Sequence, residues 1–241
     1  MRCYSFLVDG IRVLVYSPLG ERLDVSSVLA GMADGEMTVV IRPDLVADFF
    51  VECFDKRGDS PRDGDLALAV LSHFFRVVRG LPSVSLEMMY RGNLHELYIG
   101  DGDDKFSVNV GKCKLLCTKT AIFADGVEIL VDAVRLGYEC ACTSCADSDL
   151  FATERLSALR EAVVMPVGTP AIAVSFDGTM KVRTCGSIPY YDAIAVGAFS
   201  LLERGTDIPG GRLTAHVNGR RYTFSLSDGV LTFYPDIKYL Y

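Results

Sequence analysis

The chain has 241 residues, of which 50% are hydrophobic and 23% charged, and its formal net charge is −7. This balance excludes an intrinsically disordered chain, because there is ample apolar surface for a sizeable core. Nucleic-acid binding is not expected, because phosphate contacts require clustered Lys and Arg and the sequence has no such cluster. No apolar run reaches the roughly 18 residues of a membrane-spanning helix, so we expect no membrane association.

The opening stretch, MRCYSFLVDGIRVLVYS, is interrupted by Asp9 and Arg12 and has no small-residue cleavage site. It therefore predicts a strand rather than an export signal. The chain has 8 cysteines, which without export fit a reducing compartment better than a disulfide framework. We expect a cytoplasmic protein.

The first half of the chain alternates between strand and helix patterns. It predicts a strand around 13–16, a short amphipathic helix over 24–35 and a strand over 37–43. A long apolar segment, LALAVLSHFF, comes next, and hairpins within 83–110 close this half.

The second half repeats that order. A strand around 140–142, a helix over 153–163 and a strand over 169–176 precede the apolar segment AIAVGAFSLL. The hairpin that follows contains Asn218-Gly219, a pair typical of a type I′ turn. Strands that alternate with helices and then form antiparallel hairpins indicate a mixed α/β fold.

The two halves match at a nearly constant offset. Asp65 and Asp192 head the two apolar segments and lie 127 positions apart. Other landmarks recur at the same spacing: Gly10 with Gly137, Leu29 with Leu156, Leu86 with Leu213, Gly92 with Gly219, and Asp101-Gly102 with Asp228-Gly229. Several of these are glycines at turns, where backbone geometry dictates the residue. We therefore predict two similar halves, 1–125 and 126–241.

Both apolar segments are hydrophobic on nearly every helical face. A helix that is apolar all round must be buried all round. Each half is therefore expected to wrap a mixed, mostly antiparallel sheet around a central helix.

Two pseudo-symmetric halves of this kind resemble the diaminopimelate epimerase family, which extends to proline racemases and phenazine-biosynthesis isomerases. Three segments carry the likeness in order. ADGVEILVDAVRLGYE resembles the strand before the family's Gly-Asn-Pro-His turn, FDGTMKVRT the strand before its second active-site loop, and GGRLTAHVNGRRYTFS its late hairpin. The resemblance implies an α/β (α+β) fold with a ligand cleft between the halves. It also implies cofactor-independent chemistry, so we expect no cofactor and no metal.

The family's catalytic motifs are absent here. Family enzymes place one cysteine at the head of each central helix, and the two thiols exchange protons with opposite faces of the substrate α-carbon. In this sequence the first loop reads SPRDGDLALA, with Asp63, Gly64 and Asp65 and no cysteine. The second reads TCGSIPYYDAIA, which puts Tyr190 at the thiol position.

Cys185-Gly186-Ser187 resembles half of the second motif but lies about one helical turn too early. Even with that match, only one thiol would be present. The family's Gly-Asn-Pro-His turn is replaced by Gly137-Tyr138-Glu139-Cys140, and its N-terminal Gly-Asn-Asp by Val8-Asp9-Gly10. The sequence therefore differs from the family both at the positions that hold the substrate and at the positions that transfer protons.

The two aspartates at the helix heads have two interpretations. As caps, Asp65 and Asp192 would accept hydrogen bonds from the first helical N–H groups, and their charge would repel an incoming carboxylate. As a catalytic pair, they would replace the two thiols, with Cys185 or Tyr190 as a further proton-transfer group. Capping is favoured, because a helix N-terminus lowers a carboxylate pKa and so weakens it as a general base.

The remaining candidates favour structural roles. Cys140 and Cys142 alternate on a predicted strand and are expected to pack as small hydrophobes with Cys113, because a zinc site needs four ligands in paired elements. His73 is expected in the core, and His95 and His216 belong to hairpins without an acidic partner. The tyrosine pair at 190–191 could line a cleft or pack between the halves.

We expect a divergent relative of the epimerases that has lost thiol chemistry and serves in ligand binding or assembly. The alternative is an active isomerase or epimerase that uses Asp65 and Asp192. A cationic or neutral small molecule fits the acidic loops best, and a homodimer is the assembly to test. The residues expected to contact the ligand, besides these aspartates and Cys185, are Asp63, Gly64, Tyr138, Gly186, Ser187, Tyr190 and Tyr191.

Overall fold

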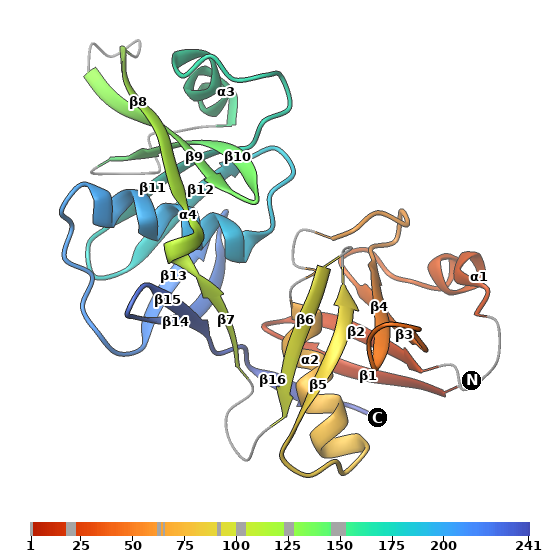
Figure 1. Cartoon of the computed structure of the whole chain (residues 1–241). Helices are drawn as coiled ribbons and strands as arrows, with labels where there is room; N and C mark the ends of the chain where they lie inside the picture. The colour runs from red at the N-terminus through yellow and green to blue at the C-terminus, as the bar shows by residue number, and fades with distance from the viewer. Residues whose placement is uncertain are drawn as a thin grey trace. The chain divides into compact units, whose positions relative to one another are not determined.

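Two sheets and four α-helices make up the described part of the chain (Figure 1). The computed structural model describes residues 2–17, 23–61, 64, 66–90, 93–99, 105–122, 128–145 and 153–241. Asp63 and Asp65, predicted at the head of the first apolar segment, lie outside these residues. No helix among the described residues is long and apolar enough to cross a membrane.

The first sheet has seven strands in the order β16-β1-β2-β3-β4-β5-β6. The pairs β2–β3 and β4–β5 are parallel, and the other neighbours are antiparallel. The strands are β1 (Arg2–Val8), β2 (Ile11–Ser17), β3 (Met37–Arg42), β4 (Phe49–Phe54), β5 (Val84–Tyr90), β6 (Asn93–Ile99) and β16 (Ile237–Tyr239).

The second sheet has nine strands in the order β7-β15-β14-β13-β12-β11-β10-β9-β8. Here β10–β11 and β12–β13 are parallel, while β8–β9, β9–β10, β11–β12, β13–β14 and β14–β15 are antiparallel. The strands are β7 (Phe106–Asn109), β8 (Lys114–Ile122), β9 (Glu128–Leu136), β10 (Tyr138–Ser144), β11 (Ala171–Phe176), β12 (Met180–Cys185), β13 (Leu213–Val217), β14 (Arg220–Ser227) and β15 (Val230–Phe233). A 3-10 turn, η2 (Val110–Lys112), joins β7 to β8.

The strand run β1–β6 has the same pairing order as the run β9–β14, namely antiparallel, parallel, antiparallel, parallel, antiparallel. The offset read from the sequence recurs in the strands. β2 begins at Ile11 and β10 at Tyr138, 127 positions later, and β6 at Asn93 and β14 at Arg220 have the same separation. The predicted mixed fold is confirmed, and the same order of strand pairing recurs in the two runs.

A helix follows the second and the fourth strand of each run. These helices are α1 (Val25–Ala30) and α2 (Leu66–His73) in the first run, and α3 (Thr153–Ala162) and α4 (Tyr190–Glu203) in the second. α2 continues as a π-helical turn, η1 (Phe74–Val78). α1 is shorter than the predicted 24–35, because it ends before Gly31, a residue with low helix propensity.

The apolar helices α2 and α4 are buried as predicted. Six of the eight residues of α2 and nine of the fourteen of α4 are buried. In the second sheet α4 contacts five strands, β9 to β13. Its Gly197 lies directly on β11, since a Cβ there would come within 3.1 Å of Val174.

The second sheet is covered by a helix on each face. α3 packs through Leu156, Leu159 and Val163 on small residues of β9, β10 and β11, which include Ala133, Ala141, Ala171 and Ala173. Val174 lies next to Ala173 along β11, and successive strand residues point to opposite faces. α3 and α4 therefore cover opposite faces of this sheet.

The chain forms two compact units, Met1–Phe106 with Tyr234–Tyr241, and Ser107–Phe233. The strands β7 and β8, which lie in the part of the sequence assigned to the first half, belong to the second sheet. Residues 237–239 form β16 beside β1. The edge strand β16 of the first sheet and both edge strands of the second sheet thus come from the part of the sequence assigned to the other half, because strand pairing is a long-range property.

Candidate functional site

The head of α4 is the candidate site that the structure describes in most detail. α4 begins at Tyr190, after Pro189 in the N-cap position, and Ala193 N donates to Pro189 O at 2.9 Å. Asp192 is therefore the third helical residue, and the expectation that it occupies the cap position is corrected. The half-buried Asp192 still places a negative charge in the first turn, where the helix dipole favours it.

The loop from Cys185 to Pro189 leads into this helix. Gly186 has φ +93°, and a Cβ there would lie 3.1 Å from Pro170 Cα, so this position requires glycine. Ile188 N donates to Gly186 O at 3.2 Å and tightens the turn. Ser187 is exposed at its tip. Both predicted contact residues of this loop thus lie directly before the head of α4.

Cys185 lies on the other face of the sheet. It is directly opposite Ala171, which is opposite Ala141, which in turn is opposite Ala133. Residues opposite one another on neighbouring strands share a face. Cys185 accordingly packs against the cluster formed with α3. The structure does not bring this thiol together with Asp192 at the head of α4.

Three other thiols belong to the α4 side of the sheet or its edge. Cys140 and Cys142 flank Ala141 on β10 and therefore point toward α4. Cys113 follows η2, which also contacts α4. All three are buried. Burial, and after it the charge of Asp192, raise the pKa of Cys113 and of Cys140 to about 12.

The charge of Asp192 therefore acts on both of these thiols. Burial also raises the pKa of Cys142 well above its ordinary value, although a hydrogen bond with Ser200 opposes this. At neutral pH these thiols are protonated, whereas the thiolate is the reactive form of cysteine. The sequence indicated that these cysteines pack as hydrophobes, but it gave no sign that two of them neighbour Asp192.

Aromatic rings surround the first turn of α4. Tyr191 is buried and makes edge contacts with Tyr222 at 5.2 Å and Phe233 at 4.6 Å between ring centroids. Tyr190 remains half-buried, and the Arg220 guanidinium lies over its ring at 5.7 Å. Tyr191 is thus a core residue of the second unit, while Tyr190 offers part of its ring at the surface.

The head of α2 is only partly described. Gly64 is buried, accepts a hydrogen bond from Ala67 N at 3.0 Å, and accepts another from the Cys53 thiol at 3.8 Å. Cys53, on β4, is the cysteine that the structure places at this helix head. Its position is not one that the family motif indicates.

The segment that replaces the Gly-Asn-Pro-His turn connects β9 to β10. Gly137 has φ +73°, and Tyr138 begins β10 with its side chain outside the described residues. Glu139 pairs with Arg135 at 2.5 Å on the surface. Within this segment, Cys140 is a residue whose thiol is affected by the charge of Asp192 in the first turn of α4.

A buried ion pair at the opposite end of α4 was missed from the sequence. Asp132 accepts hydrogen bonds from Arg204 at 2.7 Å, Ser200 at 3.2 Å and Thr118 at 2.8 Å. The signal was an acid, Asp132, within the apolar run ILVDAV. This clamp fixes α4 to β9 and thereby helps to set the position of its N-terminal end.

Among the residues that the structure describes, no three His, Cys, Asp or Glu side chains lie close enough together to hold a metal ion. His73 packs edge-on against Phe6 with 5.8 Å between ring centroids. His216 lies on β13, opposite Arg221.

No model of a protein family matches this sequence, and no curated protein matches it. Solved structures do match over nearly the whole chain. A hydroxyproline epimerase from Agrobacterium vitis with bound trans-4-OH-L-proline has a TM-score of 0.54 at 12% identity, covering 99% of this chain and 91% of that one.

A putative phenazine biosynthesis PhzC/PhzF protein from Clostridium difficile has a TM-score of 0.59 at 9% identity, covering 99% and 96%. A probable proline racemase from Agrobacterium radiobacter K84 has a TM-score of 0.53 at 11% identity, covering 99% and 92%. At such identities the likeness concerns the fold alone. The resemblance inferred from the sequence is thereby confirmed: this chain has the diaminopimelate epimerase-like fold shared by these epimerase, racemase and phenazine-biosynthesis structures.

Proposed function

We propose that this chain is a non-thiol relative of the cofactor-independent epimerases that binds a small cationic or neutral molecule at the head of α4. The observation that carries the proposal is the state of the thiols in the second unit. Cys113 and Cys140, near Asp192, are buried and have a pKa of about 12, while Cys185 lies on the opposite face of the sheet. At pH 7 a thiol of that pKa is ionised in roughly one molecule in 100,000, which disfavours it as a proton acceptor.

The charge at this helix head supports the ligand class. Asp192 supplies a carboxylate where an incoming carboxylate would otherwise find the positive end of the helix dipole. The ring of Tyr190 already carries a guanidinium, that of Arg220, over its face. The Tyr190 ring thus accepts a cation on its face.

Isomerase activity with Asp192 as an acid or base is the second candidate. It is favoured by the fold, which this chain shares with a hydroxyproline epimerase and a probable proline racemase. It ranks second because the helix N-terminus favours the charged carboxylate and so weakens it as a base.

The test for chemistry is α-proton exchange in deuterated water, followed by NMR with L-proline, trans-4-hydroxy-L-proline and diaminopimelate. We expect no exchange above the protein-free rate. Exchange that is lost in Asp192→Asn but kept in Asp177→Asn, an exposed aspartate on the β11–β12 turn, would establish the isomerase instead.

The test for binding compares L-prolinamide, a cation, with L-proline, a zwitterion, by titration calorimetry. We expect the amide to bind at least about tenfold more tightly, a difference of about 1.4 kcal/mol, and Asp192→Asn to remove this preference. Equal binding of the two compounds, or a preference that survives Asp192→Asn, would show that the ligand class is wrong. Binding of neither compound would show that the head of α4 is no site for this class.

A further inference from the structure

The segment Tyr234–Tyr241, named the returning segment, comes directly after the unit Ser107–Phe233 in the sequence but does not belong to it. It follows β15 of the second sheet, yet it belongs to the compact unit of residues 1–106. Its strand, β16, pairs only with β1 among the described strands, in the register Phe6–Tyr239 and Val8–Ile237. The first sheet thus takes its edge strand from a distant part of the chain.

Backbone hydrogen bonds attach the returning segment at both ends. Ser5 N donates to Tyr241 O and Leu240 N donates to Ser5 O, each at 2.8 Å. At the other end, Asp9 N donates to Asp236 O at 3.0 Å and Asp236 N donates to the Asp9 carboxylate at 2.9 Å. The backbone groups of Ser5 and Asp9, at the two ends of this edge, therefore have hydrogen-bond partners in the returning segment.

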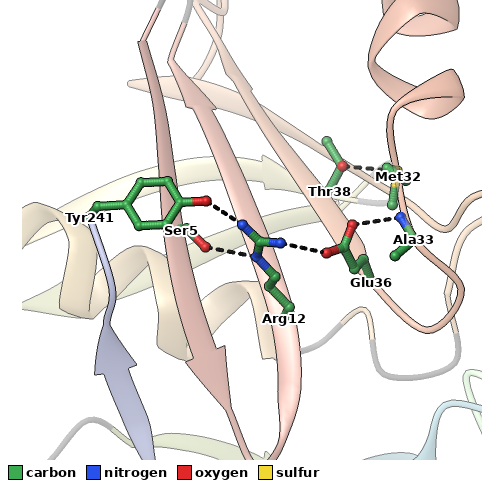
Figure 2. Close-up of polar contacts among 7 residues, drawn as sticks. All are labelled: Ser5, Arg12, Met32, Ala33, Glu36, Thr38 and Tyr241. Atoms are coloured by element: carbon green, nitrogen blue, oxygen red, sulfur yellow. Dashed lines mark hydrogen bonds and ion pairs between the residues drawn. The ribbon is translucent and has the colours of Figure 1, made fainter.

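Side chains hold the segment on both faces of the sheet. On the inner face the Tyr239 ring packs on the buried Phe6 at 5.2 Å. On the outer face Arg12 donates to the Tyr241 hydroxyl (Figure 2). Arg12 is itself oriented by Ser5 at 3.1 Å and by Glu36 at 3.0 Å. Tyr239 and Tyr241 are thus each held by a side chain of the first sheet, Tyr239 by Phe6 and Tyr241 by Arg12.

We propose that the edge of β1 is a strand-accepting site and that a second copy of this chain inserts its own returning segment there, which gives a domain-swapped dimer. The second copy fits because it presents the same aspartate, the same two tyrosines and the same backbone pattern as the resident segment. Exchange of an identical element preserves every contact and needs only a change at the connection, here Tyr234-Pro235-Asp236.

The resident segment is held more weakly than an inner strand. β16 has three residues, and Tyr239, Leu240 and Tyr241 remain 42%, 48% and 61% exposed. In the monomer the segment benefits from a high effective concentration, so the closed form dominates at low protein concentration. Refolding at high concentration, when the segment is free, allows the exchange.

A cysteine pair tests the exchange directly. Leu7 and Lys238 lie opposite one another on β1 and β16. The full-length variant Leu7→Cys/Lys238→Cys is refolded under reducing conditions over a range of concentrations and then oxidised. We expect a disulfide-linked dimer whose ratio to monomer rises about tenfold for each tenfold rise in concentration while dimer is the minor form. Monomers linked only internally at every concentration would overturn the proposal.

The native cysteines require matched controls. Leu7→Cys alone, Lys238→Cys alone and the unchanged chain are treated identically, because Cys3 and Cys117 are exposed and can be oxidised. A dimer that forms as readily in these controls would come from the native thiols and would also overturn the proposal.

A second variant separates exchange from ordinary surface association. The Tyr239–Phe6 contact is made in the monomer and in the swapped dimer, so its loss destabilises both by the same amount. Tyr239→Ala should therefore speed the approach to equilibrium at least about tenfold and leave the dimer-to-monomer ratio within about twofold, measured by light scattering. Lys238→Ala is the control, since its side chain is exposed. A ratio that falls tenfold in Tyr239→Ala would contradict the exchange.

Discussion

Asp132 on β9 and Arg204 just beyond the end of α4 form a buried ion pair with an Oδ2–Nη2 distance of 2.7 Å. Ser200 and Thr118 supply further hydrogen bonds to the same carboxylate, so both of its oxygens are satisfied. The pair joins the central helix to two strands and fixes the helix along its axis.

Asp132→Ala should destabilise the second unit by about 3 kcal/mol or more, because it leaves the mostly buried guanidinium of Arg204 without its partner. Urea denaturation followed by circular dichroism measures the loss. Arg135→Ala, which removes the exposed pair with Glu139, should cost less than about 1 kcal/mol. Equal effects of the two substitutions would show that the clamp adds nothing beyond a surface pair.

Gly197→Ala should destabilise α4 by about 1–3 kcal/mol, although alanine has the higher helix propensity. The added Cβ would meet Val174 Cγ2 at 3.1 Å and Cβ at 3.3 Å, in a packed core. Gly210→Ala is the control, because its Cβ meets nothing within 4 Å. A stabilised Gly197→Ala protein would mean that α4 can move away from β11.

Cys113 and Cys140 should resist alkylation by iodoacetamide at pH 7–8 in the folded protein, because their pKa of about 12 leaves almost no thiolate. The exposed Cys3 and Cys117 should react first. Mass spectrometry after graded labelling identifies the order. Labelling of Cys140 as fast as Cys117 would contradict the burial seen here.

The same raised pKa values make stability depend on alkaline pH. Folding keeps these thiols protonated, while the unfolded chain releases the protons near the ordinary cysteine pKa of about 9. The unfolded state therefore gains stability above that pH, and the free energy of unfolding should fall from about pH 9 to about pH 12. Cys113→Ala/Cys140→Ala should show a shallower fall over this range, as measured by urea denaturation at several pH values. An unchanged slope would assign the alkaline loss to other groups.

Asn218→Ala should cost about 2–3 kcal/mol. Asn218 adopts φ +47°, accepts from Thr184 N at 3.0 Å and donates to Thr184 Oγ1 at 2.9 Å. Asp228→Ala, at φ +50° in the next hairpin, removes a local contact with Ser227 and should cost about 1 kcal/mol. Thermal unfolding compares the two. A smaller loss at Asn218 would show that its amide does not bridge the strands.

The sequence predicted some features of the candidate site and its surroundings correctly and missed others. The offset between Asp65 and Asp192 correctly located the central helices, and the Asn218-Gly219 pair does form a tight two-residue turn with positive φ at both residues. The predicted cap at Asp192 was wrong by the length of one turn, because Pro189 begins the helix earlier than the apolar pattern indicated. The neighbourhood of Cys113, Cys140 and Asp192 joins residues far apart in the chain, and no local pattern encodes such proximity.

The sequence by itself determined the repeated order of strands and helices, the burial of α2 and α4, and the turn positions, because these follow from hydrophobic periodicity and backbone preferences within a few residues. Only the tertiary structure decided which sheet β7, β8 and β16 join, and which face of its sheet carries Cys185. Pairing and facing depend on hydrogen bonds and packing between distant segments. A shift of one residue would move every side chain of a strand to the other face.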